Sequence, residues 1–346
     1  MSNELSYEKS GVNIDIADAA KKEMAESMIT SDSRVINRPG AFASLFEARF
    51  EGVENPVLVL KAEEPGSKQL LAFQEDKVES ICYDLINHLI NDIIVMGAKP
   101  EVVLDIILCG KMEKNVVVRI VRGISDACKE QDCLLIGGET SEQPRVLPEG
   151  EYMLNASVLG VVDKSRIIDG SQIKIGDVVL ALASNGLHTN GYSLVRKLLE
   201  TRPEIMDEKI EGESFMETIL RPHKCYYQEL KNLFPQSVIK GMAHITGGGI
   251  AGNLNRILPP GTSARIELDR MEIMKIFEII KNYGQVSDQD MLKTFNMGVG
   301  ITLVADKNDV QMIRQHLQTK GCESYIIGEI IEGDQQVTYT GELNWQ

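Results

Sequence analysis

Hydrophobic and polar positions follow two different periods along the chain, which predicts helices and strands mixed throughout. In the stretch 84–97, Leu85, Leu89 and Ile93 recur every four residues and so share one helical face, and Gly97 supplies a stop. Short apolar runs between turn residues predict strands. The other elements that we expect are strands at 56–60, 102–108, 133–136, 153–162, 177–183 and 301–305, and helices at 116–131, 192–200 and 226–234.

This order of elements indicates an α+β fold with two domains. A chain of 346 residues is long for a single domain. Turn signals gather at 164–176, in Asp169-Gly170-Ser171 and Ile175-Gly176-Asp177, and they mark a boundary. We therefore predict two mixed α/β domains, at 1–168 and 169–346.

Charge and composition exclude several classes of protein. The chain has 36 Lys and Arg against 51 Asp and Glu, and its net charge of −15 argues against a broad basic face for nucleic acid or an anionic membrane. No apolar run approaches the roughly 20 residues of a membrane span, and the first residues lack the apolar core of a secretory signal. The six scattered cysteines include no C-x-x-C pair, which is typical of reduced thiols, so we expect a cytoplasmic protein.

The residue types present also bear on metal binding. With five histidines and neither H-E-x-x-H nor C-x-x-C, the sequence does not predict a zinc site. Carboxylates would hold a metal ion instead, which favours Mg²⁺. A phosphorylated ligand would then be met by such an ion, a few basic side chains and backbone N–H groups.

The run His244-Ile-Thr-Gly-Gly-Gly249 is the strongest local signal for a ligand. Consecutive glycines let the backbone approach an anion closely, and the helix expected directly afterwards would point its first N–H groups at that anion. A flexible turn is the alternative, because glycine clusters often mean no more than that. The candidate phosphate-binding residues here are Thr246, Gly247, Gly248 and Gly249, beside His244.

A second loop, Ser184–Gly191, also joins a predicted strand to a predicted helix. His188 and Asn190 lie in this loop, where their side chains could reach a ligand. A single loop histidine is also common at a protein surface, so both interpretations stay open.

Acidic residues form a third candidate group. Asp84, His88 and Asp92 fall at intervals of four residues on one side of the helix 84–97, and for Asp84 and His88 a solvated helix face is the simpler interpretation. Gly137-Gly138-Glu139 places an acid just beyond a predicted strand end, where Mg²⁺ could bridge to phosphate oxygens.

Lys68 follows the turn Pro65-Gly66-Ser67 and is either a phosphate contact or an exposed turn lysine. The chain contains no Walker pattern and no G-x-S-x-G elbow. The residues by themselves therefore predict a soluble enzyme that handles a phosphorylated ligand, a nucleotide, with Mg²⁺, and they do not name a reaction.

Taken in chain order, several segments together are similar to one family. These segments are Tyr7–Asp15, Asn91–Pro100, Leu135–Pro144, Ile168–Ser171, Ser184–Lys197, His244–Gly249 and Thr294–Gly300. As an ordered set covering nearly the whole chain, they resemble the aminoimidazole ribonucleotide synthetase (phosphoribosylformylglycinamidine cyclo-ligase) family of purine biosynthesis.

The resemblance implies a ring closure that uses ATP and Mg²⁺. ATP would phosphorylate the formyl oxygen of formylglycinamidine ribonucleotide, and attack by the ring-closing nitrogen would release phosphate and give aminoimidazole ribonucleotide. The implied fold has an N-terminal sheet domain that forms a homodimer and a C-terminal domain with α-β-α layers, with the active site in the cleft. Nucleic acid and membrane are not implied partners.

The resemblance also implies roles for individual residues. His188, Asp92 and His244 would be the catalytic side chains, and Asp92, Glu139 and Glu63 would bind the metal. The implied cofactor-binding residues are Lys68, Asn190, Thr246, Gly247, Gly248 and Gly249.

One segment departs from the family pattern. Ala62-Glu-Glu-Pro-Gly-Ser-Lys68 stands where the family has Thr-Asp-Gly-Val-Gly-Thr-Lys, so Glu63 replaces a shorter Asp, and Glu64 with Pro65 replaces the flexible Gly-Val. This departure leaves room for a catalytically weakened, nucleotide-binding paralogue. Another ATP-using member of the superfamily, a thiamine-monophosphate kinase or selenophosphate synthetase, is a further alternative, although no cysteine precedes Cys82, whereas the latter usually has one.

Overall fold

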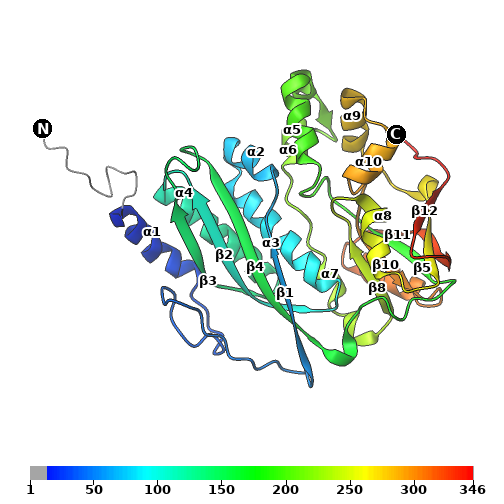
Figure 1. Cartoon of the computed structure of the whole chain (residues 1–346), viewed down its shortest axis with the longest axis horizontal. Helices are drawn as coiled ribbons and strands as arrows, with labels where there is room; N and C mark the ends of the chain where they lie inside the picture. Colours follow the sequence, from blue (N-terminus) through cyan, green and yellow to red (C-terminus); the bar gives the residue numbers. More distant parts are fainter. Residues whose placement is uncertain (1–13, 346) are drawn as a thin grey trace, which may run out of the picture. The chain divides into compact units, whose positions relative to one another are not determined.

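The fold is described from a computed structural model, which covers residues 14–345 (Figure 1). The described chain forms two compact units, one of residues 14–90 and 99–161 and the other of residues 91–98 and 162–345. The domain limits expected above, 1–168 and 169–346, stay a prediction. Most of the segment Tyr7–Asp15 lies in residues 1–13, outside the described part.

The first unit is built on a four-stranded mixed sheet in the order β1-β4-β2-β3, in which β2 runs parallel to β3 and antiparallel to β4. Its elements are α1 (Ile14–Ser27), β1 (Pro56–Glu63), α2 (Lys68–Gln74), α3 (Val78–Ile94), β2 (Lys99–Cys109), α4 (Lys114–Glu130), β3 (Leu134–Glu142) and β4 (Tyr152–Asp163).

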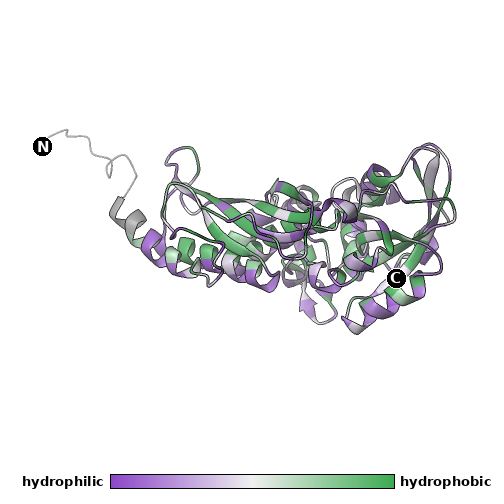
Figure 2. Cartoon of the chain, turned by 90° about the horizontal axis from the view of Figure 1, so that it is seen from below, coloured by the Kyte–Doolittle hydropathy of each residue, from purple (hydrophilic) through white to green (hydrophobic). Residues whose placement is uncertain are grey.

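The two faces of this sheet have different surroundings. On β2, Val103 and Ile107 are fully buried, whereas Leu104 and Ile106, which point to the other side, are 43% and 41% exposed. Helices α3 and α4 lie along the buried side (Figures 1 and 2). The sheet therefore has one face covered by helices and one open face that carries apolar side chains.

Helix α3 begins earlier than predicted and is buried on nearly every side. Asp84 and His88 are 0% and 7% exposed, so the interpretation of their stripe as a solvated helix face is wrong. The physical reason is that polar residues inside a fold are acceptable when they have partners, and Lys68 provides one for Asp84 at 2.8 Å.

Strand β3 is longer than the predicted strand 133–136. Gly137, Gly138 and Glu139 consequently lie within the strand, and the prediction that they follow its end is wrong. A Cβ atom on Gly138 would lie 1.7 Å from Oδ1 of Asp105 on the paired strand β2, so glycine makes room for that carboxyl group.

The second unit is built on a six-stranded mixed sheet in the order β12-β9-β11-β5-β10-β8. Its elements are β5 (Val178–Ala183), α5 (Tyr192–Thr201), β6 (Lys209–Ile210), β7 (Glu213–Ser214), α6 (Phe215–Ile219), α7 (Tyr227–Leu230), β8 (Ile239–His244), α8 (Gly249–Leu254), β9 (Thr262–Glu267), α9 (Lys275–Gly284), α10 (Asp288–Thr294), β10 (Val299–Ala305), α11 (Val310–Thr319), β11 (Ser324–Glu332) and β12 (Val337–Thr340).

Strand β10 is buried along its whole length. It pairs antiparallel with β5 and with β8, and every residue from Val299 to Ala305 is buried. A strand buried on both faces needs cover on both sides of the sheet. Together, the two mixed sheets with their helices confirm the α+β fold with two domains.

Several local expectations are corrected. The predicted helix 226–234 is the single turn of α7, and the chain continues into a short 3₁₀ segment, Phe234–Gln236, that contains Pro235, which cannot continue an α-helix. Helix α2 occupies residues that follow a predicted turn, and it begins at Lys68.

Among the described residues no helix is long and apolar enough to cross a membrane. No disulfide joins the six cysteines, all of which are described and buried.

Candidate active site

The last turn of α3 belongs to the second unit, and Asn91 fixes it there. Its side chain is fully buried, and its Oδ1 accepts the backbone N–H of Tyr226 at 3.0 Å while its Nδ2 donates to the carbonyl of Lys224 at 2.8 Å. These two bonds fix the orientation of the amide, because Oδ1 can only accept and Nδ2 can only donate. Asn91 thereby positions the residue that follows it, Asp92.

Asp92 and His244 form a hydrogen-bonded pair. Oδ1 of Asp92 lies 2.7 Å from Nδ1 of His244, which ends strand β8. A carboxylate in this position accepts the Nδ1 proton, so it sets the tautomer of the imidazole and directs Nε2 away from itself. His244 is 5% exposed, so this orientation is also held by packing.

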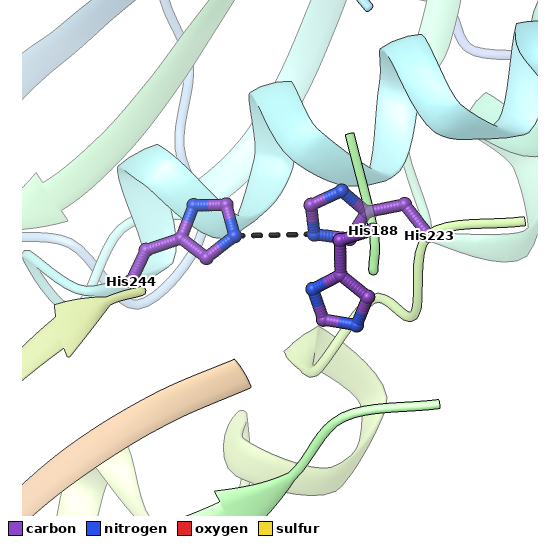
Figure 3. A group of neighbouring side chains, drawn as sticks. All are labelled: His188, His223 and His244. Carbon is purple, nitrogen blue, oxygen red and sulfur yellow. Dashed lines mark hydrogen bonds between the residues drawn. The ribbon is translucent and has the colours of Figure 1, made fainter. Parts of the chain in front are cut away.

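His223 completes a chain of hydrogen bonds that the sequence did not predict. Its Nε2 lies 3.1 Å from Nε2 of His244 (Figure 3). The same Nε2 lies 3.2 Å from Nδ2 of Asn91. Because Asn91 donates, Nε2 of His223 accepts, and its Nδ1, 3.3 Å from Oγ1 of Thr189, carries the proton. His223 stands in an irregular segment between α6 and α7, without a motif around it that could have drawn attention to it.

His188 lies against this chain from the loop between β5 and α5. Its ring stacks on that of His223, with 3.9 Å between ring centroids and 20° between planes. The backbone of His188 has φ +61°, a left-handed conformation that is uncommon for a residue other than glycine. Its exposure is only 2%, so His188 is not a surface histidine.

One close packing contact and one hydrogen bond hold the two ends of this loop. Gly191 has φ +82°, and a Cβ atom there would lie 2.1 Å from the ring of Phe295. Tyr226 donates its hydroxyl proton to the carbonyl of Ala183 at 2.8 Å, and burial raises the pKa of this phenol well above its usual range, so it stays a donor. The histidines are thus placed by a packed and hydrogen-bonded frame.

The glycine run that follows His244 already has hydrogen-bond acceptors for its three backbone N–H groups. The N–H of Gly247 donates to Oδ1 of Asn190 at 3.0 Å, that of Gly248 to the carbonyl of Lys293 at 3.0 Å, and that of Gly249 to the carbonyl of Thr246 at 3.1 Å. In this conformation the three amides already have protein acceptors, so an anion would have to displace one of them.

Two of the acidic candidates, Glu63 and Glu139, lie on different edges of the first sheet. Glu63 ends β1 and Glu139 lies in β3, and these are the two edge strands of the first sheet. Three strand spacings separate the edges, about 14 Å, so the two carboxylates of one chain cannot share a metal ion. Glu63 also pairs with Lys61 at 2.9 Å.

Lys68 is buried completely, with its Nζ 2.8 Å from Oδ1 of Asp84. The interpretation of Lys68 as an exposed turn lysine is therefore wrong. Burial lowers the pKa of its ammonium group, and the carboxylate of Asp84 counteracts that shift. A phosphate contact by this lysine stays a prediction.

Comparison with known proteins was made for sequence and for structure. Residues 52–162 match the family described as "AIR synthase related protein, N-terminal domain", and residues 174–340 match the corresponding C-terminal domain. The chain is 39% identical to a phosphoribosylformylglycinamidine cyclo-ligase of Methylobacillus flagellatus, covering 95% of each chain. It is 40% identical to the enzyme of the same name from Caldanaerobacter subterraneus subsp. tengcongensis, covering 95% of this chain and 98% of the relative.

Solved structures with the same fold have low sequence identity. Thiamine-monophosphate kinase from Stenotrophomonas maltophilia superimposes with a TM-score of 0.64 at 15% identity, covering 95% of this chain and 96% of that one. The hydrogenase maturation protein HypE in complex with ATP gives a TM-score of 0.65 at 14% identity, covering 95% and 92%. These likenesses show the fold alone.

Proposed function

The chain belongs to the AIR synthase related family, and on that basis we propose that it is a phosphoribosylformylglycinamidine cyclo-ligase. The reaction is the ATP-dependent cyclisation of formylglycinamidine ribonucleotide to aminoimidazole ribonucleotide, with release of ADP and phosphate. The observation that carries this proposal is identity of 39–40% to cyclo-ligases over at least 95% of both chains. The kinase with the same fold reaches only 15% identity, so a thiamine-monophosphate kinase is the weaker candidate.

The residues of this chain fit ATP and Mg²⁺ in their chemistry. Carboxylate oxygens are the ligands that Mg²⁺ prefers, and Asp92, Glu63 and Glu139 are the acids we propose for it. Because Glu63 and Glu139 of one chain lie on opposite sheet edges, we propose that one ion is held by one of them and not by both. When bound, ATP with Mg²⁺ supplies the phosphoryl group that converts the formyl oxygen into a leaving group.

The proposed part of His244 is to hold or move a proton at Nε2. The carboxylate of Asp92 accepts from Nδ1 and stabilises the imidazolium form, as it does in other carboxylate–histidine pairs. The ring-closing nitrogen must lose a proton when it attacks, and a buried, oriented imidazole is suited to that step. His188, which stacks on His223 in the same group, is the second proposed proton-handling side chain.

Asn190, Thr246 and the glycines 247–249 are proposed as phosphate contacts. The loop they form is connected by the bond from Gly247 to Asn190, so these residues would respond to a ligand together. Displacement of that bond by a phosphate oxygen would expose the Gly247 N–H group to the anion, as the predicted phosphate-binding loop requires.

A second copy of the chain is the proposed partner, together with a phosphorylated ribonucleotide substrate. Leu58 and Leu60 of β1 and Leu104 and Ile106 of β2 are 41–72% exposed, and large apolar side chains left exposed on a sheet favour contact with another protein surface. We also propose a cytoplasmic location, which is supported by the six cysteines that form no disulfide.

The direct experiment is to incubate the purified protein with formylglycinamidine ribonucleotide, ATP and Mg²⁺ and to follow ADP and aminoimidazole ribonucleotide. We expect both products in equal amounts. ADP formed from thiamine monophosphate instead would contradict the proposal, and nucleotide binding without either product would favour the weakened paralogue.

Asp92→Asn tests the proposed pair. The amide cannot stabilise an imidazolium, so we expect kcat to fall about 10²- to 10⁴-fold with an unchanged circular dichroism spectrum. Asp334→Asn removes an exposed carboxylate elsewhere in the second unit and serves as the control. Full activity in the Asp92 variant would show that this carboxylate has no part in turnover.

A further inference from the structure

The second unit brings three buried histidines together from separate parts of the chain. His188 comes from the loop before α5, His223 from the segment before α7, and His244 from the end of β8 (Figure 3). One ring nitrogen of each lies within 4.8 Å of the others. We propose that these three side chains bind a divalent transition-metal ion that prefers imidazole ligands, such as Zn²⁺.

The central observation is the contact between His223 and His244. Their Nε2 atoms are 3.1 Å apart, and two lone pairs cannot face each other at that distance, so a positive centre must lie between them. It is either a proton on one nitrogen or a metal ion bound by both. Two nitrogens that bind one tetrahedral Zn²⁺ at 2.0–2.1 Å lie about 3.3 Å apart, so only a small movement separates the two states.

The bonds on Nδ1 of both imidazoles leave Nε2 as the atom that would coordinate an ion. On His223 the ion would replace the N–H of Asn91, whose Nδ2 lies 3.2 Å from that Nε2. Oδ1 of Asp92 accepts from Nδ1 of His244 at 2.7 Å, and Oγ1 of Thr189 lies 3.3 Å from Nδ1 of His223. Metal-binding histidines nearly always donate their second N–H to such an oxygen, which fixes the ring and raises its basicity. The Asp92 carboxylate also offsets part of the charge of an ion at this buried position.

His188 is the third ligand. Because its ring is stacked on that of His223, with 20° between planes, it has to turn about its side-chain bonds to direct a nitrogen at the same ion. Its left-handed backbone conformation brings the side chain into this buried position, where stacking holds it in the absence of an ion.

The donor set selects the class of ion. Three neutral nitrogens suit Zn²⁺, Co²⁺ or Cu²⁺, whereas Mg²⁺ requires oxygen ligands and keeps several waters. Three protein ligands leave a fourth tetrahedral position for water or a ligand atom. The site is therefore distinct in chemistry from the carboxylate site proposed for Mg²⁺. One consequence, which rests on the proposed function, is that an ion bound to His188 and His244 would inhibit ring closure.

Cobalt provides a direct test of the binding itself, independent of any activity. Co²⁺ titrated into the whole protein in the presence of excess Mg²⁺ should give a visible ligand-field spectrum that saturates at one equivalent and is abolished by Zn²⁺. His223→Ala should abolish this spectrum, and Asp92→Asn should weaken Co²⁺ binding about 10- to 100-fold. His316→Ala removes a histidine of α11 whose Nε2 lies 3.0 Å from the carbonyl oxygen of Glu229, outside the three-histidine group, and this variant should bind Co²⁺ like wild type.

Either of two results would overturn the metal site: no saturable Co²⁺ spectrum in wild type, or the same spectrum in His223→Ala as in His316→Ala. Folding of each variant is checked by circular dichroism, and His223→Gln, which keeps a polar side chain of similar length, replaces the alanine variant if that one does not fold. Because the readout is spectroscopic, failure of the cyclo-ligase assay and failure of metal binding are observed separately.

Discussion

Asp105 should make the stability of the protein depend on pH in a way that a single substitution removes. Its carboxyl group lies on the helix-covered face of β2 and is 3% exposed. Within the described residues its Oδ2 has no hydrogen-bond partner, and its Oδ1 lies over Gly138 of β3. Burial raises the pKa of this carboxyl to about 7 from its usual 3.8.

The sign and size of the effect follow from that shift. Between about pH 4 and about pH 7, the folded protein keeps a proton on this carboxyl group that the unfolded chain has lost. The free energy of unfolding therefore falls as pH rises through this range. A shift of about 3 units corresponds to about 4 kcal/mol once the group is ionised in both states. Between pH 5 and pH 8.5 the contribution of Asp105 should change by about 3 kcal/mol.

Asp105→Asn keeps the shape of the side chain and removes the ionisation. We expect the free energy of unfolding of the variant, minus that of wild type, to rise by about 3 kcal/mol between pH 5 and pH 8.5. Urea unfolding followed by far-ultraviolet circular dichroism measures this difference at each pH. The single tryptophan, Trp345, belongs to the second unit, so its fluorescence reports separately on a part of the chain that the substitution does not touch.

Asp126→Asn, on the exposed side of α4, is the matched control and should show no such change with pH. If the difference between Asp105→Asn and wild type stays constant within about 0.5 kcal/mol across this pH range, the carboxyl of Asp105 is not titrating near neutrality. The reasoning from its burial would then be refuted.

Two further substitutions test packing that the sequence did not predict. Asp84→Asn should lower the free energy of unfolding in urea by about 3–5 kcal/mol, because it removes the negative charge beside the buried ammonium of Lys68. Replacing Asp84 by Leu and Lys68 by Met in one variant should recover most of that loss. An unchanged midpoint in the single variant would contradict a buried ion pair. Gly249→Ala should cost about 2–5 kcal/mol in thermal unfolding, because a Cβ atom there lies 1.8 Å from the carbonyl oxygen of Leu292 at φ +63°. Gly252→Ala in the same helix meets no atom within 4 Å and should not be destabilised, and equal losses in the two variants would count against the close approach.

Local sequence patterns predicted the elements whose burial follows a simple period. Leu85, Leu89 and Ile93 recur on one helical face, and that helix exists, although it begins at Val78. The pattern could not show that the opposite face is buried too, because Asp84 and His88 look the same in sequence whether they face water or a partner across the fold. Glu139 was predicted to follow its strand for a similar reason. The two glycines before it signal a turn locally, but Gly138 instead accommodates Asp105 of the neighbouring strand.

What the sequence determined by itself is the family, the two-domain α+β fold and the candidate loops around His188 and His244, because ordered local motifs carry that information. Only the tertiary structure decided which of these side chains meet. It joined Asp92 to His244 across 152 positions of sequence and placed His223 between His244 and Asn91. The same arrangement brings together the three histidines proposed as a metal site, where the sequence predicted no zinc. The ligands of such a site need to be close in space and not along the chain, and a spacing rule detects only ligands that lie near one another in sequence.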